Sequence, residues 1–399
     1  MRVRVRVGVA LLLIVVVLAA VNYLRPIPAV AASPLLPATD TVPGTAPTLP
    51  WPSRGSAAVA VSGLGFVGSS GNEQAIPAAS VTKVMTALVV LEDKALKKGE
   101  TGPAVTMTDT DVQSYQADLK DQQSVVKVEA GETLTEFQLL QGMLIPSANN
   151  FAETIARWDA GSIDSFVAKM NARASALRLT HTKFADVSGA SAGSVSTASD
   201  LVSLGMVAMQ NEVFAQIVAM EQATLPVAGI VINVNGALGT SGIIGIKTGS
   251  GLNAGANYLF AANVTADGHT IVVYGCVMGQ PTLDVAFSGA RTLIGAMASA
   301  LHVRRVIARN QSVATYTTPW GAQTDLVSTV DVDLAEWPGM VLRQHLDAKQ
   351  IVIDNPLPSR TREGIEHLVL GDYVLDVPLV TADPMYPPGR LWRLTRVRF

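Results

Sequence analysis

The pattern of apolar and polar residues divides the 399-residue chain into stretches of different character. An uncharged and mostly apolar run, Val7–Leu24, follows a basic N-terminus that carries Arg2, Arg4 and Arg6. This order is typical of an export signal, and the run is also about long enough to span a bilayer. Small residues at Ala29-Val30-Ala31 offer a site for signal peptidase. We therefore expect residues 1–32 to be a cleaved signal peptide or a membrane anchor, with the rest of the chain outside the cytoplasm.

Residues 33–55 interrupt the apolar pattern because they are rich in Pro, Ala and Thr. Such a composition predicts an extended or disordered linker. Regular patterns begin at residue 56. Short strands are predicted at Ala57–Val61 and Phe66-Val67, and the spacing of apolar residues predicts a helix over Ser80–Leu91, with one face formed by Val81, Val84, Met85 and Leu88.

Blocks of helical and strand periodicity continue up to residue 301. Helices are predicted at Glu136–Met143, Asn150–Trp158, Asp164–Leu179, Ser199–Met209 and Leu283–Leu301, and strands at Ile243–Lys247, Tyr258–Val264 and Thr270–Met278. This order predicts a sheet domain over 56–301 with an inserted helical subdomain. The family resemblance described below implies an α/β fold in which the sheet is antiparallel and flanked by helices.

The pattern changes again after residue 301. Short alternating runs punctuated by Pro and Gly predict a separate, small all-β domain over 302–399. Its strands are expected at Ser312–Tyr316, Leu326–Val332, Ile351–Ile353, Tyr373–Val377 and Leu391–Phe399.

Composition narrows the range of functions. Charged residues make up 15% of the chain and the net charge is −3, which argues against a nucleic-acid-binding protein because such proteins have a basic surface. The five histidines lie far apart, and no H-E-x-x-H motif or Cys/His cluster is present, so a metal hydrolase is not expected. Cys276 is the single cysteine and is interpreted as a small buried residue without a disulfide partner.

The candidate chemistry lies in three short motifs, Ser80-Val81-Thr82-Lys83, Ser147-Ala148-Asn149 and Lys247-Thr248-Gly249. Each is weak alone, since the first serine could be a helix N-cap, the second a loop hydroxyl, and the last lysine a surface cation. A second S-x-x-K, Ser124–Lys127, precedes a short strand predicted at Val125–Val128, where residues three apart point to opposite faces. Ser80 instead opens a predicted helix, so Lys83 is expected one turn away on the same face.

These residue types suit nucleophilic catalysis. A serine hydroxyl needs a base, and a lysine can act as that base only when its amine is neutral. Positive charge on Lys247 would help to lower the pKa of Lys83. Ser147 can pass a proton to a leaving group, and Asn149 can hold a substrate amide and Lys83 together. Lys247 and Thr248 can grip a substrate carboxylate, and the glycine that follows lets the strand backbone approach a ligand.

The motifs resemble those of the low-molecular-mass penicillin-binding proteins, the serine D-Ala-D-Ala carboxypeptidases of the β-lactamase-like superfamily. The resemblance covers about Ala57–Leu301 and includes Gly131–Leu134, Leu139–Pro146 and Ser196–Leu201. It implies a β-lactamase-like, transpeptidase-like catalytic fold, followed here by a β-rich domain. No metal or organic cofactor is implied.

The resemblance also implies a role for each motif residue. Ser80 would be the acylated nucleophile, Lys83 its general base, and Ser147 with Asn149 the proton relay. Substrate would be bound by Asn149, Lys247, Thr248, Gly249 and Ser250, and the backbone N–H groups of Ser80 and Ser250 would form the oxyanion hole.

The chain departs from the family pattern beside these motifs. Asn150 stands where the family commonly has Asp, and Asp186–Ser191 replaces the usual Asn-Pro-x-Gly-Leu turn, so a different shape is expected for that loop. Ser250-Gly251 follows the K-T-G where a bulkier pair is common, which bears on substrate preference.

The implied activity is hydrolysis of the terminal D-Ala from peptidoglycan stem peptides, with sensitivity to penicillin. The expected partners are stem peptides, β-lactams and, if the N-terminal segment is uncleaved, the membrane. A D,D-endopeptidase that cuts cross-links would use the same residues, and this alternative stays open. A class A β-lactamase is disfavoured because none of Glu153, Glu212 and Glu221 is followed by Asn at the fourth position. Intact motifs argue against a non-catalytic wall-binding protein.

Overall fold

A computed structural model describes residues 2–71 and 74–396. The chain forms two compact units. One comprises Pro47–His302, and the other combines segments from both ends of the chain, Met1–Ala46 and Val303–Phe399. The motif residues all lie in the first of these units.

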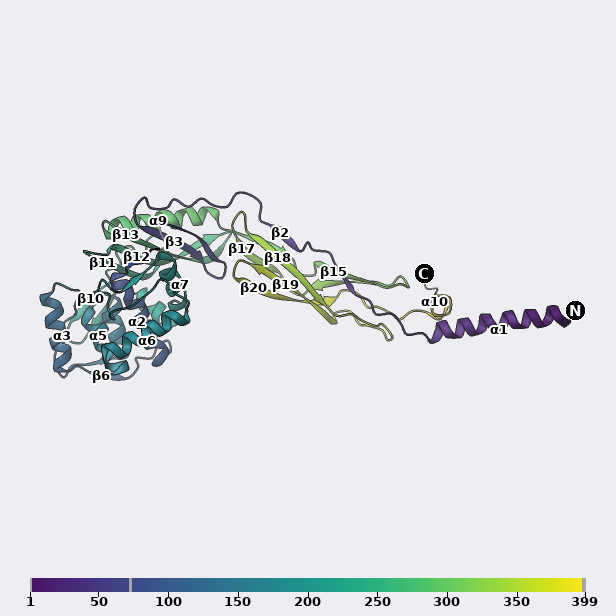
Figure 1. Cartoon of the computed structure of the whole chain (residues 1–399), viewed down its shortest axis with the longest axis horizontal. Helices are drawn as coiled ribbons and strands as arrows, with labels where there is room; N and C mark the ends of the chain where they lie inside the picture. The colour runs from purple at the N-terminus through teal and green to yellow at the C-terminus, as the bar shows by residue number, and fades with distance from the viewer. Residues whose placement is uncertain (1, 72–73, 397–399) are drawn as a thin grey trace. The chain divides into compact units, whose positions relative to one another are not determined.

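The Pro47–His302 unit is built on a five-stranded antiparallel sheet with the strand order β11-β12-β13-β3-β4 (Figure 1). Its strands are β3 (Ser56–Val61), β4 (Gly65–Ser70), β11 (Ile243–Gly251), β12 (Gly255–Ala266) and β13 (His269–Gln280). The predicted strands are therefore confirmed, and the N-terminal hairpin joins the sheet beside the last strand rather than the first. Asp267-Gly268 forms the turn between β12 and β13.

Helices cover both faces of this sheet. On one face, α9 (Leu283–Ala300) packs Phe287 edge-on against Tyr258 of β12, with ring centroids 4.8 Å apart. The neighbouring Leu259 points to the other face and joins the core formed with α2 (Lys83–Asp93) and α7 (Ala198–Ala208). The alternation along β12 thus buries apolar side chains on both faces.

The helical subdomain contains α3 (Asp109–Lys120), α4 (Glu136–Leu144), α5 (Asn149–Ala160), α6 (Ile163–Ala176) and α8 (Glu212–Val218). Helices α4 to α7 agree with the predicted ranges within a few residues. Helix α3 was not predicted, because it has little hydrophobic periodicity and begins instead with a capping box between Thr108 and Asp111. Short strand pairs accompany these helices: β5 (Ile76–Pro77) with β8 (Val195–Ser196), β6 (Ala104–Thr106) with β7 (Thr133–Thr135), and β9 (Gln222–Leu225) with β10 (Gly229–Ile232).

The second unit contains a seven-stranded sheet in the order β1-β15-β16-β20-β19-β18-β2, and a separate pair, β14 with β17. Its strands are β1 (Ala32–Pro34), β2 (Thr39–Thr41), β14 (His302–Ile307), β15 (Ser312–Thr317), β16 (Gln323–Ser328), β17 (Val332–Glu336), β18 (Val341–Ala348), β19 (Arg362–Leu370) and β20 (Tyr373–Thr381). The predicted run Leu326–Val332 is split, because the Ser328 hydroxyl and the Val330 backbone hydrogen-bond each other in a turn. Ile351–Ile353 forms only a single bridge, from Ile351 to Val30.

The segment expected to be a linker is partly folded into this sheet, which corrects the prediction for residues 33–55. Strand β1 pairs with β15, and β2 pairs with β18. The Asp40 carboxylate also accepts a hydrogen bond from Arg304 at 2.9 Å. Composition does not reveal these strands, because they lie at the two edges of the sheet. An edge strand pairs with only one neighbour and tolerates a proline such as Pro34.

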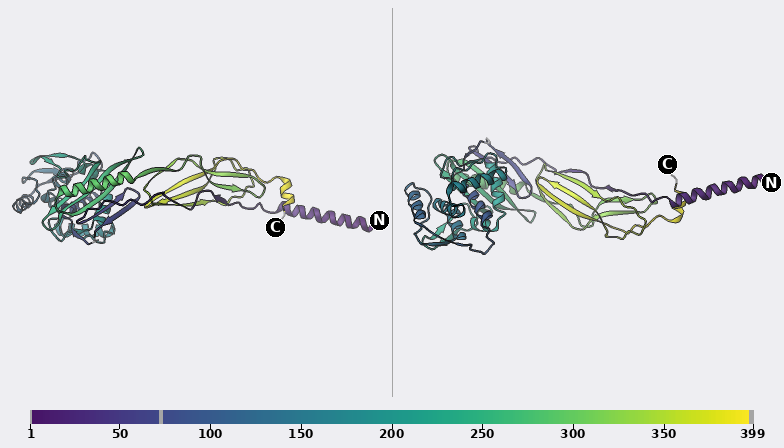
Figure 2. Two further views of the ribbon diagram at one scale, coloured as in Figure 1. Left: turned by 90° about the horizontal axis from the view of Figure 1, so that it is seen from above. Right: turned by 60° about the horizontal axis from the view of Figure 1, so that its bottom comes forward.

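The run Leu391–Phe399 was predicted as a strand, but it contains the short helix α10 (Arg390–Thr395), and residues 397–399 lie outside the described part. The helix lies beside the end of α1 (Arg2–Leu24) in Figures 1 and 2. The Arg396 guanidinium donates to the Asn22 carbonyl, and Trp392 packs on Trp320 with ring centroids 5.3 Å apart. Contacts with residues distant in sequence stabilise this helix, and the alternation of apolar and polar residues, from which a strand was predicted, does not reveal them.

Candidate active site

Ser80, Asn149 and Ser250 line a cleft of about 520 Å³. Other polar side chains of the three motifs are buried and are not among its lining residues: Lys83, Ser147, Lys247 and Thr248. The walls of the cleft are the start of the helix at Ser80, the 121–123 segment, Asn149, the 189–192 turn, and the turn between β11 and β12. Residues Ala79–Thr82 form a 3-10 turn that leads directly into α2. Ser80 is half-buried and faces the cleft, whereas Lys83 is completely buried behind it.

Lys83 connects the first two motifs. Its Nζ donates to Ser80 Oγ at 2.9 Å, to Asn149 Oδ1 at 2.7 Å and to the Ser188 carbonyl at 2.9 Å. These acceptors satisfy all the donors of an ammonium group. The predicted contact between the serine and the lysine one turn later is therefore present.

Burial lowers the pKa of Lys83 from its usual 10.5 to about 7. The negative charges of Asp186 and Asp118 oppose this change by raising the pKa. The amine can therefore exist in its neutral form near neutral pH, which is the form that can accept a proton.

Lys247 lies on β11 and is also completely buried, with its Nζ donating to the Thr248 carbonyl at 3.2 Å. Burial holds its pKa well below the usual value, and the charge of Lys83 lowers that pKa further. Burial is the main reason for the low pKa of both lysines, and the mutual repulsion of their charges adds to it.

Gly249 allows β11 to approach the start of α2. A Cβ atom at this position would lie 2.9 Å from the Ala78 carbonyl oxygen and 3.0 Å from the Ser80 nitrogen. A glycine is therefore required here because a side chain would collide with the backbone around Ser80, whether or not a ligand also approaches this strand. Ser250 follows it and lines the cleft.

Asn257 was missed by the sequence analysis, although it supports the same region. It lies opposite Gly249 in β12, its amide donates to the Pro77 carbonyl at 2.9 Å, and its carbonyl oxygen accepts from the Gly279 N–H at 2.9 Å. This side chain ties the segment before Ser80 to the sheet. A buried asparagine within an apolar strand was the signal that could have found it.

The second motif turns sharply into α5. Ser147 is buried and has a φ of 68°, a left-handed conformation that is uncommon outside glycine and is found at functional sites. Asn149 begins the helix. Its N–H donates to the Ser124 carbonyl at 2.7 Å, and its side-chain amide donates to Gln123 Oε1 at 3.2 Å.

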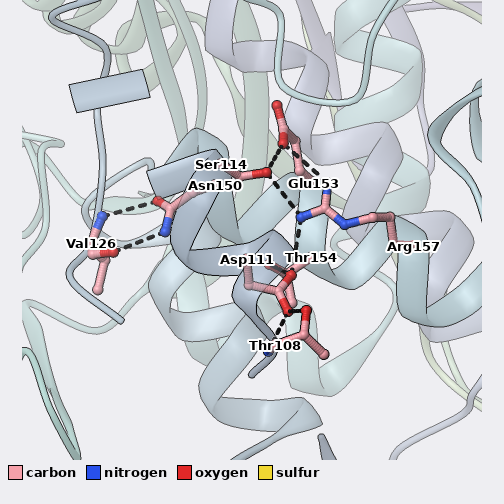
Figure 3. Close-up of polar contacts among 8 residues, drawn as sticks. All are labelled: Thr108, Asp111, Ser114, Val126, Asn150, Glu153, Thr154 and Arg157. Carbon is pink, nitrogen blue, oxygen red and sulfur yellow. Dashed lines mark hydrogen bonds and ion pairs between the residues drawn. The ribbon is translucent and has the colours of Figure 1, made fainter. Parts of the chain in front are cut away.

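The second S-x-x-K motif therefore lies beside the site, but only the Ser124 carbonyl takes part. The strand predicted at Val125–Val128 does not form, although Val126 and Val128 are buried and Lys127 is exposed, as an alternating pattern requires. The reason is visible in Figure 3, where the Asn150 side chain takes the place of a neighbouring strand. It accepts from the Val126 N–H at 3.1 Å and donates to the Val126 carbonyl at 2.9 Å.

A polar network holds α3 against α5 beside this segment (Figure 3). Arg157 donates to Asp111 at 3.0 Å, to Ser114 at 3.1 Å and to Glu153 at 3.2 Å. Asp111 also accepts from the Thr154 hydroxyl at 2.7 Å. This network occupies Glu153, which therefore supports the wall of the cleft rather than its interior.

No carboxylate from Glu153, Glu212 or Glu221 lines the cleft, and among residues 2–71 and 74–396 the acidic residue that does so is Asp121. Within residues 2–71 and 74–396, no group of three or more His, Cys, Asp or Glu side chains is arranged to hold a metal ion. The side chains that line the cleft thus offer a serine hydroxyl, amides and the Asp121 carboxylate, and the buried Lys83 amine contacts that serine.

Comparison with known proteins agrees with this chemistry. A family model described as D-alanyl-D-alanine carboxypeptidase matches residues 66–282. The chain is 36% identical over 217 residues to a D-alanyl-D-alanine carboxypeptidase of Mycobacterium tuberculosis, a match that covers 52% of this chain and 69% of the relative. It is 32% identical over 165 residues to a D-alanyl-D-alanine endopeptidase of Pseudomonas aeruginosa, covering 41% of this chain and 50% of that protein.

Solved structures show the same likeness. The DD-transpeptidase of Streptomyces K15 superposes with a TM-score of 0.53 at 27% identity, covering 64% of this chain and 98% of that one. Penicillin-binding protein 5 of Haemophilus influenzae superposes with a TM-score of 0.61 at 18% identity, covering 86% and 100%, a likeness of fold alone. The expected fold class, an α/β catalytic domain followed by an all-β domain, is confirmed.

Proposed function

Because the chain belongs to the D-alanyl-D-alanine carboxypeptidase family, we propose that it removes the terminal D-alanine from peptidoglycan stem peptides through an acyl-enzyme on Ser80. The observation that carries this proposal is the 2.9 Å contact between Lys83 Nζ and Ser80 Oγ, together with a Lys83 pKa lowered to about 7. A neutral lysine at this distance can take the serine proton at the pH of the cell envelope.

In the acylation step, Ser80 Oγ attacks the carbonyl carbon between the two D-alanines while its proton passes to Lys83. The C–N bond then breaks, and the leaving D-alanine amine receives a proton from Lys83 by way of Ser147. The backbone N–H groups of Ser80 and Ser250 stabilise the oxyanion, a role that the close approach of Gly249 to the Ser80 nitrogen supports.

Substrate binding relies on the third motif and on Asn149. The free carboxylate of the terminal D-alanine binds Lys247 and Thr248, because a buried amine gains most from an opposite charge in a site of low dielectric. Asn149 holds Lys83 through its oxygen, and its amide lies beside Gln123 at the edge of the cleft, where a substrate backbone can replace that contact.

Deacylation uses the same lysine. A water attacks the Ser80 ester, Lys83 accepts the water's proton, and this proton returns to Ser80 Oγ as the acyl product leaves. Among residues 2–71 and 74–396, no glutamate lines the cleft to activate this water, which supports a peptidase over a class A-type β-lactamase.

We further propose that α1 anchors the protein at the outer face of a membrane. Val5–Leu24 is long and apolar enough to span a bilayer, with a mean hydropathy of 2.7 and no residue buried in the protein. Aromatic and basic side chains gather where it ends: Arg393 lies over the Tyr23 ring at 5.8 Å, and Arg396 over the Trp392 ring at 5.3 Å. Such residues are typical of the membrane–water interface. Mass spectrometry of the membrane fraction would test this, because cleavage after Ala31 would remove α1.

The activity is tested with the full chain in detergent, a diacetyl-Lys-D-Ala-D-Ala peptide and a penicillin label. We expect D-alanine release and a penicillin adduct on Ser80, both lost in Ser80→Ala and both kept in Ser124→Ala. Label on Ser124, or no label, would contradict the proposal. Cleavage of a cross-linked dimer without release of D-alanine from the monomer peptide would establish the endopeptidase alternative, to which relatives at 30–35% identity point.

A further inference from the structure

The turn that holds Lys83 from behind is organised by one carboxylate. Asp186 Oδ2 accepts hydrogen bonds from the backbone N–H groups of Ser188, Gly189 and Ala190 at 3.1, 2.7 and 2.9 Å, and from the Ser188 hydroxyl at 2.8 Å. Its Oδ1 accepts from the Ser194 hydroxyl at 2.5 Å. A single side chain thus fixes three successive N–H groups.

This turn is joined to the catalytic helix by two neighbouring carbonyls. The Ser188 carbonyl accepts from Lys83 Nζ at 2.9 Å, and the Val187 carbonyl accepts from the Thr86 hydroxyl at 2.6 Å. Gly189 has a φ of +82°, and a Cβ atom there would lie 1.8 Å from the Ala79 carbonyl oxygen. The turn therefore lies directly against the residues around Ser80, with no room to shift toward them.

The charge of Asp186 also reaches Lys83. It is the largest of the effects that raise the pKa of Lys83 against burial, and the other is Asp118 on α3. The remaining charged group beside Lys83 is Lys247 on β11, whose own pKa is lowered by that contact. Asp186 is half-buried, so its charge is only partly screened by water.

We propose that Asp186 is a positioning residue for Lys83: its carboxylate fixes the turn whose Ser188 carbonyl holds the lysine amine, and its negative charge faces that amine from outside the cleft. This inference rests on the proposed role of Lys83 as the general base. It assigns a function to the place where the chain departs from the family's Asn-Pro-x-Gly-Leu turn, because an asparagine would supply the same hydrogen-bond geometry without the charge.

Asp186→Asn and Asp186→Ala separate the two effects. The asparagine oxygen can still accept from the three N–H groups, so these bonds of the turn are kept while the charge and the bond from the Ser194 hydroxyl are lost. We expect Asp186→Asn to acylate with penicillin at pH 8 within about threefold of wild type, since effects on the intact turn are small. Asp186→Ala should lose about tenfold to a hundredfold, because a misplaced catalytic group loses that much.

The pH profile identifies the charge effect. Removing a negative charge lowers the pKa of Lys83, so the low-pH limb of the acylation rate should move to lower pH in Asp186→Asn. Asp118→Asn is the matched control, since it removes the other negative charge near Lys83 but does not touch the turn. It should move the limb in the same direction without the loss seen in Asp186→Ala.

Equal losses in Asp186→Asn and Asp186→Ala, or an unmoved limb in Asp186→Asn, would overturn the proposal. Titration of the Lys83 side chain by NMR, with its carbon signal assigned through Lys83→Arg, gives a readout that does not depend on turnover. A Lys83 signal that shifts between wild type and Asp186→Asn in a protein that releases no D-alanine would uphold the electrostatic link while refuting the proposed function.

Discussion

The amines of Lys83 and Lys247 are both completely buried, and the charge of Lys83 lowers the pKa of Lys247 beyond the effect of burial. Two ammonium groups so close together disfavour each other in a region of low dielectric. Their proton-binding equilibria therefore depend on which other charges enter the cleft. The charged form of Lys83 is stabilised by Asp186 and Asp118. The charged form of Lys247 would be stabilised by a negative charge on a bound substrate.

Activity should rise with pH through the titration of Lys83. The proposed base is the neutral amine, whose pKa burial lowers to about 7, so the enzyme should be inactive well below that pH and reach a plateau above it. The measurement is kcat/KM for a D-Ala-D-Ala peptide between pH 5 and 9, because this ratio reports the pKa of the free enzyme. A plateau that persists down to pH 5 would mean that Lys83 is not the titrating base.

Binding of a substrate carboxylate should be accompanied by proton uptake on Lys247. Burial and Lys83 hold its pKa low in the free protein, and a bound carboxylate raises it again. Calorimetry with Ser80→Ala and a D-Ala-D-Ala peptide should therefore give a binding enthalpy that depends on the ionisation enthalpy of the buffer. A peptide amide, which lacks the carboxylate, serves as the control and should show a smaller dependence.

The same reasoning predicts the effect of Lys247→Ala. Loss of a charge-assisted contact costs about 1.5–3 kcal/mol, which corresponds to about ten- to a hundredfold in kcat/KM. Thermal stability should fall little, since burial of the amine is itself unfavourable. Wild-type kcat/KM in this variant would remove Lys247 from the carboxylate site.

Asn150→Asp should destabilise the wall of the cleft, although aspartate is common at this position in the family. The Asn150 amide donates to the Val126 carbonyl at 2.9 Å, and a carboxylate would place an acceptor against that acceptor in a buried position. We expect a loss of about 1–3 kcal/mol in the free energy of unfolding, as for an unsatisfied buried group. Asn150→Ala leaves both the N–H and the carbonyl of Val126 without this partner, so it should be destabilised as well, by about 1–3 kcal/mol for each group. An Asp variant as stable as wild type would show that Val126 is held by other contacts.

Much of the site was predictable because it depends on local spacing. Ser80 and Lys83 lie one helical turn apart and are in contact. The strands of the sheet are buried on both faces, so each appears in the sequence as a short apolar run. The parts that were missed depend on partners distant in sequence. Helix α3 is held by the Arg157–Asp111 network, β1 and β2 pair with strands near residues 316 and 341, and Asp186 acts through a backbone carbonyl that no motif marks.

The protein should release D-alanine repeatedly from peptides but hold penicillin for minutes or longer. Lys83 regains its neutral form after the leaving group departs and can then activate water, provided that water can reach the ester. D-Alanine leaves the cleft and opens this space, whereas a ring-opened β-lactam keeps its leaving group attached and occupies it. Glu153, Glu212 and Glu221 do not line the cleft, and Glu153 is bound to Ser114 and Arg157 in the network of Figure 3.

The measurement follows penicillin hydrolysis under excess antibiotic beside D-alanine release from a diacetyl-Lys-D-Ala-D-Ala peptide. Asp121 is the acidic side chain that lines the cleft, so Asp121→Asn is the informative control. If Lys83 is the deacylating base, this variant should keep the wild-type rate for the peptide and the wild-type lifetime of the penicillin adduct. A longer adduct lifetime in Asp121→Asn would assign water activation to that carboxylate. Rapid turnover of penicillin with negligible release of D-alanine would instead identify a β-lactamase, although no glutamate of the described residues lines the cleft.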